Sequence, residues 1–144
     1  MNIHSAKRAD LPAVRALLET ERLPASDLDE QALDRFLILR DDSGVSGVVG
    51  LELYGEVAFL RSLVVAQHGR GSGVGSALTQ AAERLAAEFG VKDVYLLTQT
   101  AERFFAGRGY SKMDRGDAPK EIQGTTQFSG LCPSSAVLMM KQLR

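Results

Sequence analysis

The sequence is poor in cysteine, nearly neutral overall and free of long apolar runs. Its single cysteine, Cys132, excludes an intramolecular disulfide and fits a reducing compartment, so we expect a cytoplasmic protein. The 17 basic and 18 acidic residues leave a net charge of -1, which provides no electrostatic footprint for nucleic acid or for an anionic membrane. No apolar run approaches the roughly 18 residues of a membrane-spanning helix, and the chain start lacks the residue order of a signal peptide.

The composition and length are those of one globular domain. The chain has 144 residues, of which 44% are apolar and 24% charged, enough for a hydrophobic core of its own. We find no linker, repeat or low-complexity tract and expect a single domain over residues 1–144.

Apolar periodicity and turn residues predict where helices and strands lie. Strands are expected over residues 2–6, 36–40, 45–54, 57–65, 91–98, 110–113 and 136–143. Helices are expected from an N-cap at Asp10, with Pro12 in the first turn, toward Pro24; from Asp27 or Asp29 to about Arg35; over 74–90; and over 101–108. Residues 114–135 are expected to be irregular and are a candidate cover for a binding pocket.

The order of these elements indicates the fold class. Short connections between the strands of residues 36–65 predict an antiparallel meander. The strand, loop, helix and strand of residues 57–98 form a βαβ crossover, whose two strands should be parallel. The sequence therefore predicts an α/β fold with a mixed, mostly antiparallel twisted sheet of six to seven strands and about four flanking helices.

Four glycines stand at alternate positions between the last predicted strand of the meander and the helix that follows it: Gly69, Gly71, Gly73 and Gly75. Glycine loses the most backbone entropy on folding, so this density indicates a need for bare backbone. Unpaired N–H groups and the positive end of the helix dipole meet at a helix N-terminus. The loop therefore predicts a cradle for a phosphate or pyrophosphate, to which Arg70 would add a charge-assisted bond; the alternative is a glycine-rich turn without a ligand.

Two common phosphate-binding patterns are absent from this loop. A Walker P-loop requires Gly-Lys, a pair that occurs nowhere in the chain. The GxGxxG dinucleotide pattern fails because Val74 and Ser76 occupy its sixth position when it is counted from Gly69 and Gly71. That pattern also opens the first βαβ unit, whereas antiparallel strands precede the loop here. A nucleotide-binding α/β domain is therefore disfavoured.

The pattern that fits is Arg70-x-x-Gly73-x-Gly75, which resembles the R/Q-x-x-G-x-G/A motif of the GNAT superfamily of N-acetyltransferases. Three segments resemble that superfamily in the right order: RADLPAVRALL (8–18) its first helix, LRSLVVAQHGRGSGVGSAL (60–78) its central strand, loop and helix, and AERFFAGRGY (101–110) its A-x-x-F-Y-x-x-x-G-F segment. Order and spacing agree over residues 1 to about 113.

This resemblance implies a single-domain GNAT fold that binds acetyl-CoA as co-substrate and needs no metal. The coenzyme-binding residues that it implies are Leu63, Val64, Val65, Arg70, Gly71, Ser72, Gly73, Val74, Gly75, Ser76, Thr98, Phe104 and Phe105. In the superfamily a splayed strand end presents backbone N–H groups to the thioester carbonyl oxygen. Carried over, the catalytic amide is that of Val64 or Val65, and such an oxyanion donor contributes about 3 kcal/mol.

Two residues depart from the superfamily pattern. Phe105 stands where a tyrosine often lies near the coenzyme sulfur as general acid, which argues against a tyrosine acid at that place. Thr98 stands where an asparagine is common, which weakens one expected polar contact near the coenzyme arm. The thiol of the leaving group has a pKa of about 8.5, so an acid that protonates it is helpful rather than mandatory. Phe104 and Phe105 then pack in the core, along the coenzyme arm, or both.

The C-terminal third resembles a narrower group. DAPKEI (117–122) and TTQFSGLCPSSAVLM (125–139), together with LELYGEVAFLRSLVV (51–65), resemble the arsenic-resistance branch of these acetyltransferases. The resemblance implies acetylation of the primary amine of a small amino acid-like compound, with an arsenic-containing amino acid as the implied acceptor. Homodimers are frequent in the superfamily, so a homodimer is also expected.

Three strand residues are candidates for work on the acceptor. An alkyl ammonium must lose a proton before it reacts, and Glu52 is a candidate base or a solvent-facing strand residue. Arg61 is expected to share a face with Phe59 and Leu63, where it binds an acidic group of the acceptor or forms a structural ion pair. Tyr54 orients the acceptor through its hydroxyl or is an edge aromatic.

The remaining chemically reactive side chains form no recognisable site. His4 and His68 lack metal-ligand spacing, although His68 lies near the predicted phosphate cradle. Cys132 has no second cysteine with which to bind trivalent arsenic and is interpreted as a small buried hydrophobe. Two function hypotheses follow: an N-acetyltransferase that works by direct attack in a ternary complex, and an acyl-CoA-binding module that senses or regulates without turnover.

Overall fold

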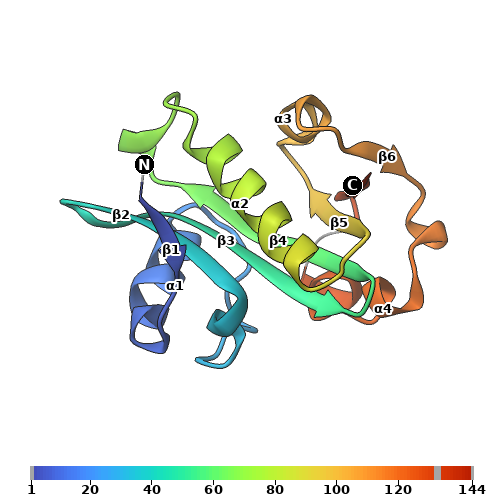
Figure 1. Ribbon diagram of the computed structural model, residues 1–144, viewed down its shortest axis with the longest axis horizontal. Helices are drawn as coiled ribbons and strands as arrows, with labels where there is room; N and C mark the ends of the chain where they lie inside the picture. The colour runs from blue at the N-terminus through green and yellow to red at the C-terminus, as the bar shows by residue number, and fades with distance from the viewer. Residues whose placement is uncertain (1, 132–133, 144) are drawn as a thin grey trace.

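A computed structural model describes residues 2–131 and 134–143 and shows a seven-stranded sheet in the order β1-β2-β3-β4-β5-β7-β6 (Figure 1). The strands are β1 (Ile3–Ser5), β2 (Phe36–Asp41), β3 (Gly44–Tyr54), β4 (Val57–Val65), β5 (Asp93–Thr98), β6 (Ser111–Met113) and β7 (Val137–Gln142). The α-helices of the described residues are α1 (Leu11–Thr20), α2 (Val74–Glu88), α3 (Glu102–Gly107) and α4 (Lys120–Gln123). Among the strand pairs of the described residues only β4 and β5 are parallel, which confirms the predicted α/β class, the mixed sheet and the crossover through α2.

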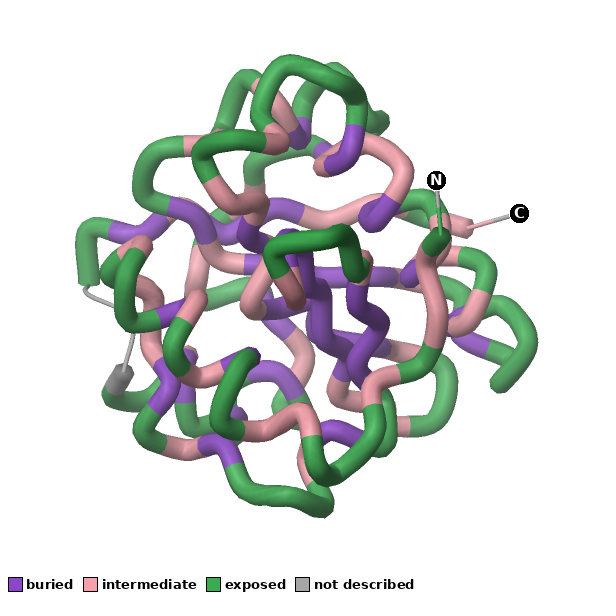
Figure 2. The backbone as a smooth tube through the Cα atoms, turned by 90° about the vertical axis from the view of Figure 1, so that its left-hand side faces the viewer, coloured by how far each residue is buried: buried purple, intermediate pink, exposed green. Residues whose placement is uncertain are grey.

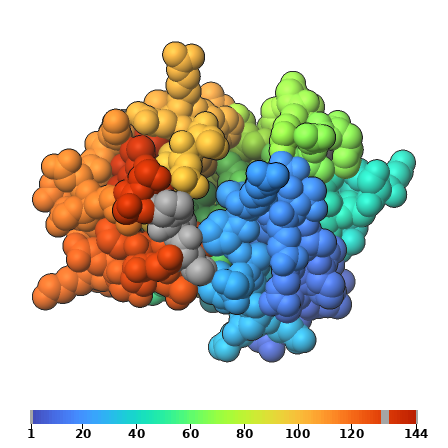
Figure 3. Space-filling model, turned by 180° about the vertical axis from the view of Figure 1, so that it is seen from behind, coloured from blue at the N-terminus to red at the C-terminus, as the bar shows by residue number. Residues whose placement is uncertain are grey.

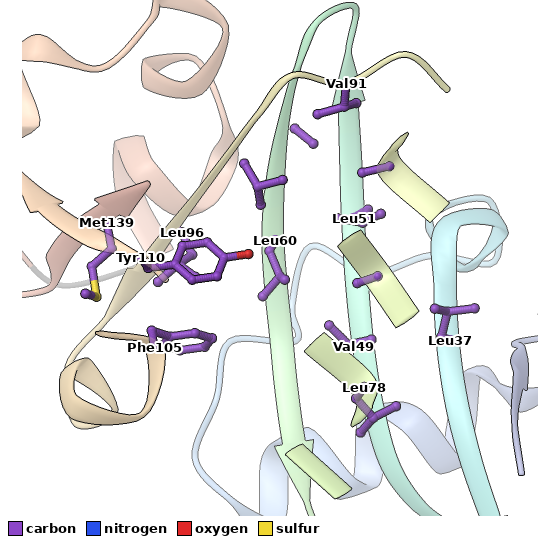
Figure 4. Close-up of a cluster of buried hydrophobic side chains, with 14 of the residues drawn as sticks. Leu37, Val49, Leu51, Leu60, Leu78, Val91, Leu96, Phe105, Tyr110 and Met139 are labelled. Carbon is purple, nitrogen blue, oxygen red and sulfur yellow. The ribbon is translucent and has the colours of Figure 1, made fainter. Parts of the chain in front are cut away.

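Helices cover both faces of the sheet. The apolar face of α2 packs on Val49 and Leu51 of β3 and Leu60 of β4, within the cluster that Figure 4 draws. The apolar face of α1 packs instead with Val48. Because neighbouring strand residues point to opposite faces, Val48 and Val49 place α1 and α2 on opposite sides of the sheet. Figure 2 shows the resulting buried centre with exposed backbone around it.

Helix α4 lies on the same face as α1. Its Ile122 is fully buried against Phe59 of β4 and Leu138 of β7, on the side of the sheet away from α2. Figure 3 shows this back face, with the N-terminal segment in blue and the segment of residues 114–131 in orange and red. The two segments therefore flank the middle of the sheet from the same side.

A β-bulge interrupts β4 close to its C-terminal end. Gly50 of β3 pairs with Arg61, but Val48 pairs with Val64, so one residue of β3 opposes both Ser62 and Leu63. Ser62 has a φ of 60°, which turns the strand at this point. The bulge places Leu63 on the α2 side, so the prediction that Leu63 shares a face with Arg61 is wrong, because the alternation of side chains does not continue through a bulge.

The N-terminal helices differ from the prediction at their starts. Asp10 does not cap α1 through its side chain; its carboxylate accepts the N–H of Lys7 at 2.8 Å, and a 3₁₀ turn precedes α1. The second predicted helix is only a 3₁₀ turn over Ala32–Arg35, at whose start Asp29 accepts the N–H of Ala32 at 2.8 Å. Both carboxylates accept backbone N–H groups, as expected at the start of a helix. Each lies beside a short 3₁₀ turn, however, where the apolar periodicity predicts the first turn of an α-helix.

The segment of residues 114–135 is less irregular than predicted. It contains a 3₁₀ turn over Arg115–Asp117, helix α4 and a π-helical turn over Gln127–Leu131. These turns are too short to show a periodic pattern in the sequence. Cys132 lies outside the described residues. No helix within the described part of the chain has both the length and the apolar character needed to cross a bilayer.

The buried hydroxyl of Tyr110 gives the fold a predicted sensitivity to alkali. Tyr110 packs edge-on against Phe105 (Figure 4), and its hydroxyl donates to Glu83 Oε2 at 2.9 Å. Burial, and then the charge of Glu83, raises the pKa of Tyr110 above the ordinary value of about 10. Above that pH the unfolded chain loses the phenolic proton while the folded chain keeps it, so the free energy of unfolding falls as the pH rises.

Urea titrations from about pH 9 to 11 measure this effect. The fall in the free energy of unfolding should be shallower in Tyr110→Phe than in the wild type, with Tyr54, Tyr95 and Lys92 contributing to the slope that remains. Below that range the stability contribution of the neutral phenol is fully present. Equal slopes in the two proteins would contradict a phenol that stays neutral in the folded state.

Candidate functional site

Strands β4 and β5 pair over three residues and then separate. The parallel register joins Val57–Phe59 to residues 93–95 and ends there. Beyond it lies a cavity of about 750 Å³ between the two strand ends. The cavity is lined by residues 60–65 of β4, 96–101 at and after the end of β5, 21–24 after α1, and by Arg70, Phe105, Gln127 and Ala136. The parallel pair β4 and β5 thus opens where a small molecule can enter between the two strands.

The register of β3 and β4 fixes which amides face this opening. Residues of an antiparallel pair alternate between exchanging hydrogen bonds with the partner strand and facing away from it. Ala66 donates its N–H to the carbonyl of Ser46 at 2.8 Å, so Val64 also faces β3 and Val65 faces away. The carbonyl of Val65 accepts Nε of Arg70 at 3.1 Å, in agreement with that direction. The register therefore favours the N–H of Val65 over that of Val64 as a donor into the cavity.

After β4 and a 3₁₀ turn over Gln67–Gly69, the glycine loop presents bare backbone. Gly71 and Gly73 both have a φ of 83°, and a Cβ at either would meet no heavy atom within 4 Å. Gly73 precedes α2, whose first turn closes with the N–H of Ala77 on the carbonyl of Gly73 at 3.0 Å. The N–H groups of Val74, Gly75 and Ser76 therefore have no acceptor within the helix. An open loop with several outward N–H groups at the positive end of a helix fits a diphosphate.

The other two glycines of the loop serve packing. A Cβ at Gly75 would lie 3.3 Å from Cζ of Phe104, and one at Gly69 would lie 3.4 Å from Cγ1 of Val65. Phe104 can therefore lie close to the first turn of α2 because position 75 has no side chain. Only two of the four alternating glycines are required by backbone conformation.

The polar side chains of the loop already have partners within the protein. Arg70 forms an ion pair with Glu21 at the end of α1, in addition to its bond to the carbonyl of Val65. The Ser72 hydroxyl donates to the carbonyl of Gly69 at 2.6 Å, and the Ser76 hydroxyl accepts from Arg108. Arg70 thus ties the loop to α1, and a phosphate contact by its side chain stays a prediction.

The aromatic pair of α3 borders the opening. Phe105 is 5% exposed, lines the cavity and meets Phe104 edge-on with ring centroids 5.1 Å apart. Thr98 ends β5, and its Oγ1 accepts the N–H of Ala101 at 3.0 Å before α3 begins. Phe105 therefore belongs both to the core and to the cavity wall, and it brings no ionisable group to the site.

Arg61 is the centre of a buried polar network on the α1 side of the sheet. Its side chain is 3% exposed, and its two terminal nitrogens donate to Asp27 Oδ2 and Oδ1 at 2.5 and 2.7 Å. One of these nitrogens also donates to Glu52 Oε2 at 2.9 Å, and Nε donates to Ser62 Oγ at 3.0 Å. Burial alone would lower the pKa of Arg61, but its bonds to the two carboxylates and their charges raise it above its usual range.

Tyr54 completes this network. Its hydroxyl donates to Glu52 Oε1 at 2.5 Å, so both oxygens of Glu52 accept hydrogen bonds. Burial, and then the bond to Glu52, raises the pKa of Tyr54, which keeps the phenol protonated through any ordinary assay range. The structure thus brings together the three predicted acceptor residues, Glu52, Tyr54 and Arg61. Of these only Arg61 lines the cavity, and its bonds to Asp27 and Glu52 match the structural ion pair.

Sequence reasoning missed several polar residues near the site. Asp27 was assigned only a helix start, although a buried arginine on a predicted strand requires a carboxylate partner from elsewhere. Glu21 and Gln127 line the cavity, and no local pattern marks either of them.

His68 lies at the surface, where its ring contacts Asp41 at 2.8 Å. Within residues 2–131 and 134–143 no cluster of three potential metal ligands occurs.

Comparisons with known proteins agree with this geometry. A sequence model described as the acetyltransferase (GNAT) family matches residues 3–110, which is more than half of the chain. No significant match was found among curated proteins. The arsenic-resistance branch therefore has no support beyond the sequence resemblance.

Solved structures share the fold at low sequence identity. N-acetylglutamate synthase from Neisseria gonorrhoeae, complexed with coenzyme A and N-acetyl-glutamate, superposes with a TM-score of 0.85 and 20% identity over 99% of this chain and 35% of that one. Rv2747 from Mycobacterium tuberculosis, in complex with CoA, gives a TM-score of 0.84 at 18% identity over the whole of both chains. A GNAT-family acetyltransferase from Staphylococcus aureus Mu50 gives 0.76 at 17% identity over 99% of each chain.

At these identities the structures establish the fold, and the sequence model establishes the relationship. The predicted single-domain GNAT architecture is confirmed, with its glycine loop at the start of α2 and its split sheet. The chain therefore belongs to the acetyltransferase (GNAT) family.

Proposed function

We propose that this protein is an acetyl-CoA-dependent N-acetyltransferase that acts on the primary amine of a small amino acid-like acceptor, by direct attack in a ternary complex. One observation carries the proposal: the open glycine loop follows, after one 3₁₀ turn, the strand whose Val65 faces the cavity between β4 and β5. This order supports a diphosphate site in the loop next to an acyl site in the cavity. Relatives of the same fold are complexed with CoA, and one of them with N-acetyl-glutamate.

The residues present fit the coenzyme along this line. The N–H groups of residues 71–76 hold the diphosphate against the positive end of α2. Thr98, Phe104 and Phe105 border the path from the loop into the cavity. When bound, acetyl-CoA supplies an acetyl group activated as a thioester. The polar loop backbone and the apolar wall suit the charged and the apolar parts of such a molecule.

The chain assists the reaction mainly by position and by one backbone donor. The N–H of Val65 stabilises negative charge on the carbonyl oxygen, an effect of about 3 kcal/mol for a typical oxyanion donor. Holding the acceptor and the acyl group together in the cavity supplies roughly 7 kcal/mol or more. These two effects are large enough that a weak acid–base apparatus suffices.

Proton removal from the acceptor is assigned to Glu52 through water. Phe105 cannot donate a proton to the leaving group, but a thiol pKa of about 8.5 would allow that group to leave as a thiolate. Glu52 is not part of the cavity lining, but it accepts a hydrogen bond from Arg61, which is, and its side chain is 24% exposed, so water reaches it. Arg61 and Tyr54 fix its orientation.

An assay of thiol release tests the proposal. Purified protein is mixed with acetyl-CoA and a panel of amines that includes amino acids and their phosphinic and arsinic analogues, since the sequence resemblance adds an arsenic-containing amino acid to the candidate acceptors. Release of free thiol that depends on the amine supports catalysis. Tight CoA binding without release favours a sensor or regulatory module instead. Homodimerisation, measured by light scattering, and a cytoplasmic location stay separate predictions.

Substitution of Glu52 should affect the rate most at low pH. In Glu52→Gln we expect kcat to fall about 100-fold, because the amide cannot accept the proton of the acceptor ammonium. The loss should be greatest where the smallest fraction of free amine is present. The measurement is a pH–rate profile beside that of Glu56→Gln, whose side chain is 70% exposed in the β3–β4 turn. An unchanged profile with a folded protein removes Glu52 from the mechanism.

A further inference from the structure

Arg22 occupies an unusual backbone position at the end of α1. Its φ is 61°, a left-handed conformation that side chains other than glycine rarely adopt. The N–H of Leu23 bonds to the carbonyl of Leu18 at 2.9 Å, which closes the helix end around Arg22. This closure is the Schellman type, in which the residue at this position is usually glycine.

Helix α2 ends in the same geometry and uses the expected residue. Gly90 has a φ of 83°, and the N–H of Val91 bonds to the carbonyl of Ala86 at 3.1 Å. The chain therefore places glycine at one helix end and arginine at the other, although the backbone requirement is the same. The arginine carries a steric cost that glycine would avoid, so its side chain should contribute something else.

The position of Arg22 indicates what that contribution is. Arg22, Arg61 and Arg70 are the arginines that line the cavity between β4 and β5. Arg61 is held by Asp27 and Glu52, and Arg70 by Glu21. Arg22 makes no side-chain hydrogen bond or ion pair with any residue in the described ranges 2–131 and 134–143. It is thus the cavity arginine whose guanidinium is available to a ligand.

We propose that Arg22 binds the carboxylate, or an equivalent acidic group, of the acceptor amino acid. A guanidinium presents two parallel N–H donors that match the two oxygens of a carboxylate. Binding of the acidic group of the acceptor, which the sequence suggests for Arg61, is thus assigned to Arg22. Arg61 already donates to two carboxylates of the protein. This inference rests on the proposed function, since it names the group by which that acceptor is recognised.

The test compares acceptors that differ only in the carboxylate. Wild type, Arg22→Gly and Arg22→Lys are assayed for thiol release with acetyl-CoA and a panel of the standard amino acids and their phosphinic and arsinic analogues, each beside the amine that lacks its α-carboxylate or equivalent acidic group. Arg22→Gly removes the guanidinium and relieves the left-handed conformation, so it should fold at least as well as the wild type. Arg84→Ala is the matched control, because Arg84 is an exposed arginine of α2 at a different cavity.

We expect the wild type to prefer the amino acid over the matching amine. In Arg22→Gly the KM for the amino acid should rise about 10-fold or more, as expected for loss of a charge-assisted bond, while kcat and the KM for acetyl-CoA stay unchanged. Arg22→Lys should restore part of the preference, and Arg84→Ala should resemble the wild type.

Each contrary result points to a specific error. A preference for the carboxylate that survives in Arg22→Gly, or a wild type that prefers the amines, overturns the role of Arg22 and leaves the acetyltransferase proposal standing. A rise in the KM for acetyl-CoA alone assigns Arg22 to the coenzyme and also overturns it. If folded wild type binds CoA but releases no thiol with any member of the panel, the proposed function itself fails.

Discussion

Replacing Gly73 by valine is expected to weaken CoA binding by about 100-fold or more while the protein stays folded. The side chain would project into the open space of the loop, where no protein atom lies within 4 Å of the Cβ position. The φ of 83° at this position is also strained for valine, so the N–H groups around it would turn from their present directions. Loss of two charge-assisted bonds is enough for the stated effect.

The control for this variant is another glycine in the same conformation. Gly55 has a φ of 68° and equally open space around its Cβ position, but it lies in the β3–β4 turn at the opposite end of β4 from the loop. Gly55→Val should therefore carry similar strain and leave CoA affinity unchanged in calorimetric titrations. Intact affinity in Gly73→Val, or an equal loss in both variants, would contradict the proposed loop geometry.

Removing the carboxylate of Asp27 should lower the free energy of unfolding by about 3 kcal/mol or more. Arg61 is almost fully buried and donates two of its hydrogen bonds to Asp27. In Asp27→Ala the Arg61 guanidinium would keep only Glu52 as a charged partner. A buried charge that loses one of its partners is strongly destabilising. The loop after α1 would also lose its anchor on β4.

A double-mutant cycle in urea separates this coupling from general damage. Asp27→Leu, Arg61→Met and the double variant are compared, and the double variant should be more stable than the sum of the single losses predicts, by about 1 kcal/mol or more. Asp34→Ala is the control, because its ion pair with Arg8 is exposed and should contribute little. Additive losses, or a small loss in Asp27→Ala, would show that the pair is not a coupled buried unit.

Local sequence patterns were sufficient for the central part of the fold. The apolar strand before Val65, the glycine loop and the i, i+3, i+4 pattern from Val74 to Gly90 are contiguous, so each reports on its own backbone. The structure confirms this strand, loop and helix order and the parallel return strand. Helix α2 ends at Gly90 in the left-handed conformation that glycine favours, as its place after the last apolar position of the helix suggests.

The parts that sequence could not provide depend on pairing between distant segments. The bulge at Ser62 depends on the pairing register of β3 and β4, and the sequence of neither strand alone indicates it. The partner of Arg61 comes from a loop 34 positions away, so the choice between an acceptor site and an ion pair required the fold. No sequence motif marks Arg22, and only the three-dimensional structure reveals its left-handed conformation and its place in the cavity wall.

Hydrogen–deuterium exchange of the wild-type protein with and without CoA tests the central claim most directly. If backbone amides hold the diphosphate, saturating CoA should slow exchange at residues 71–76 and leave exchange in the β3–β4 turn around Gly55 unchanged. Unaltered exchange over the loop under saturating CoA, or protection confined to another surface, would contradict the account.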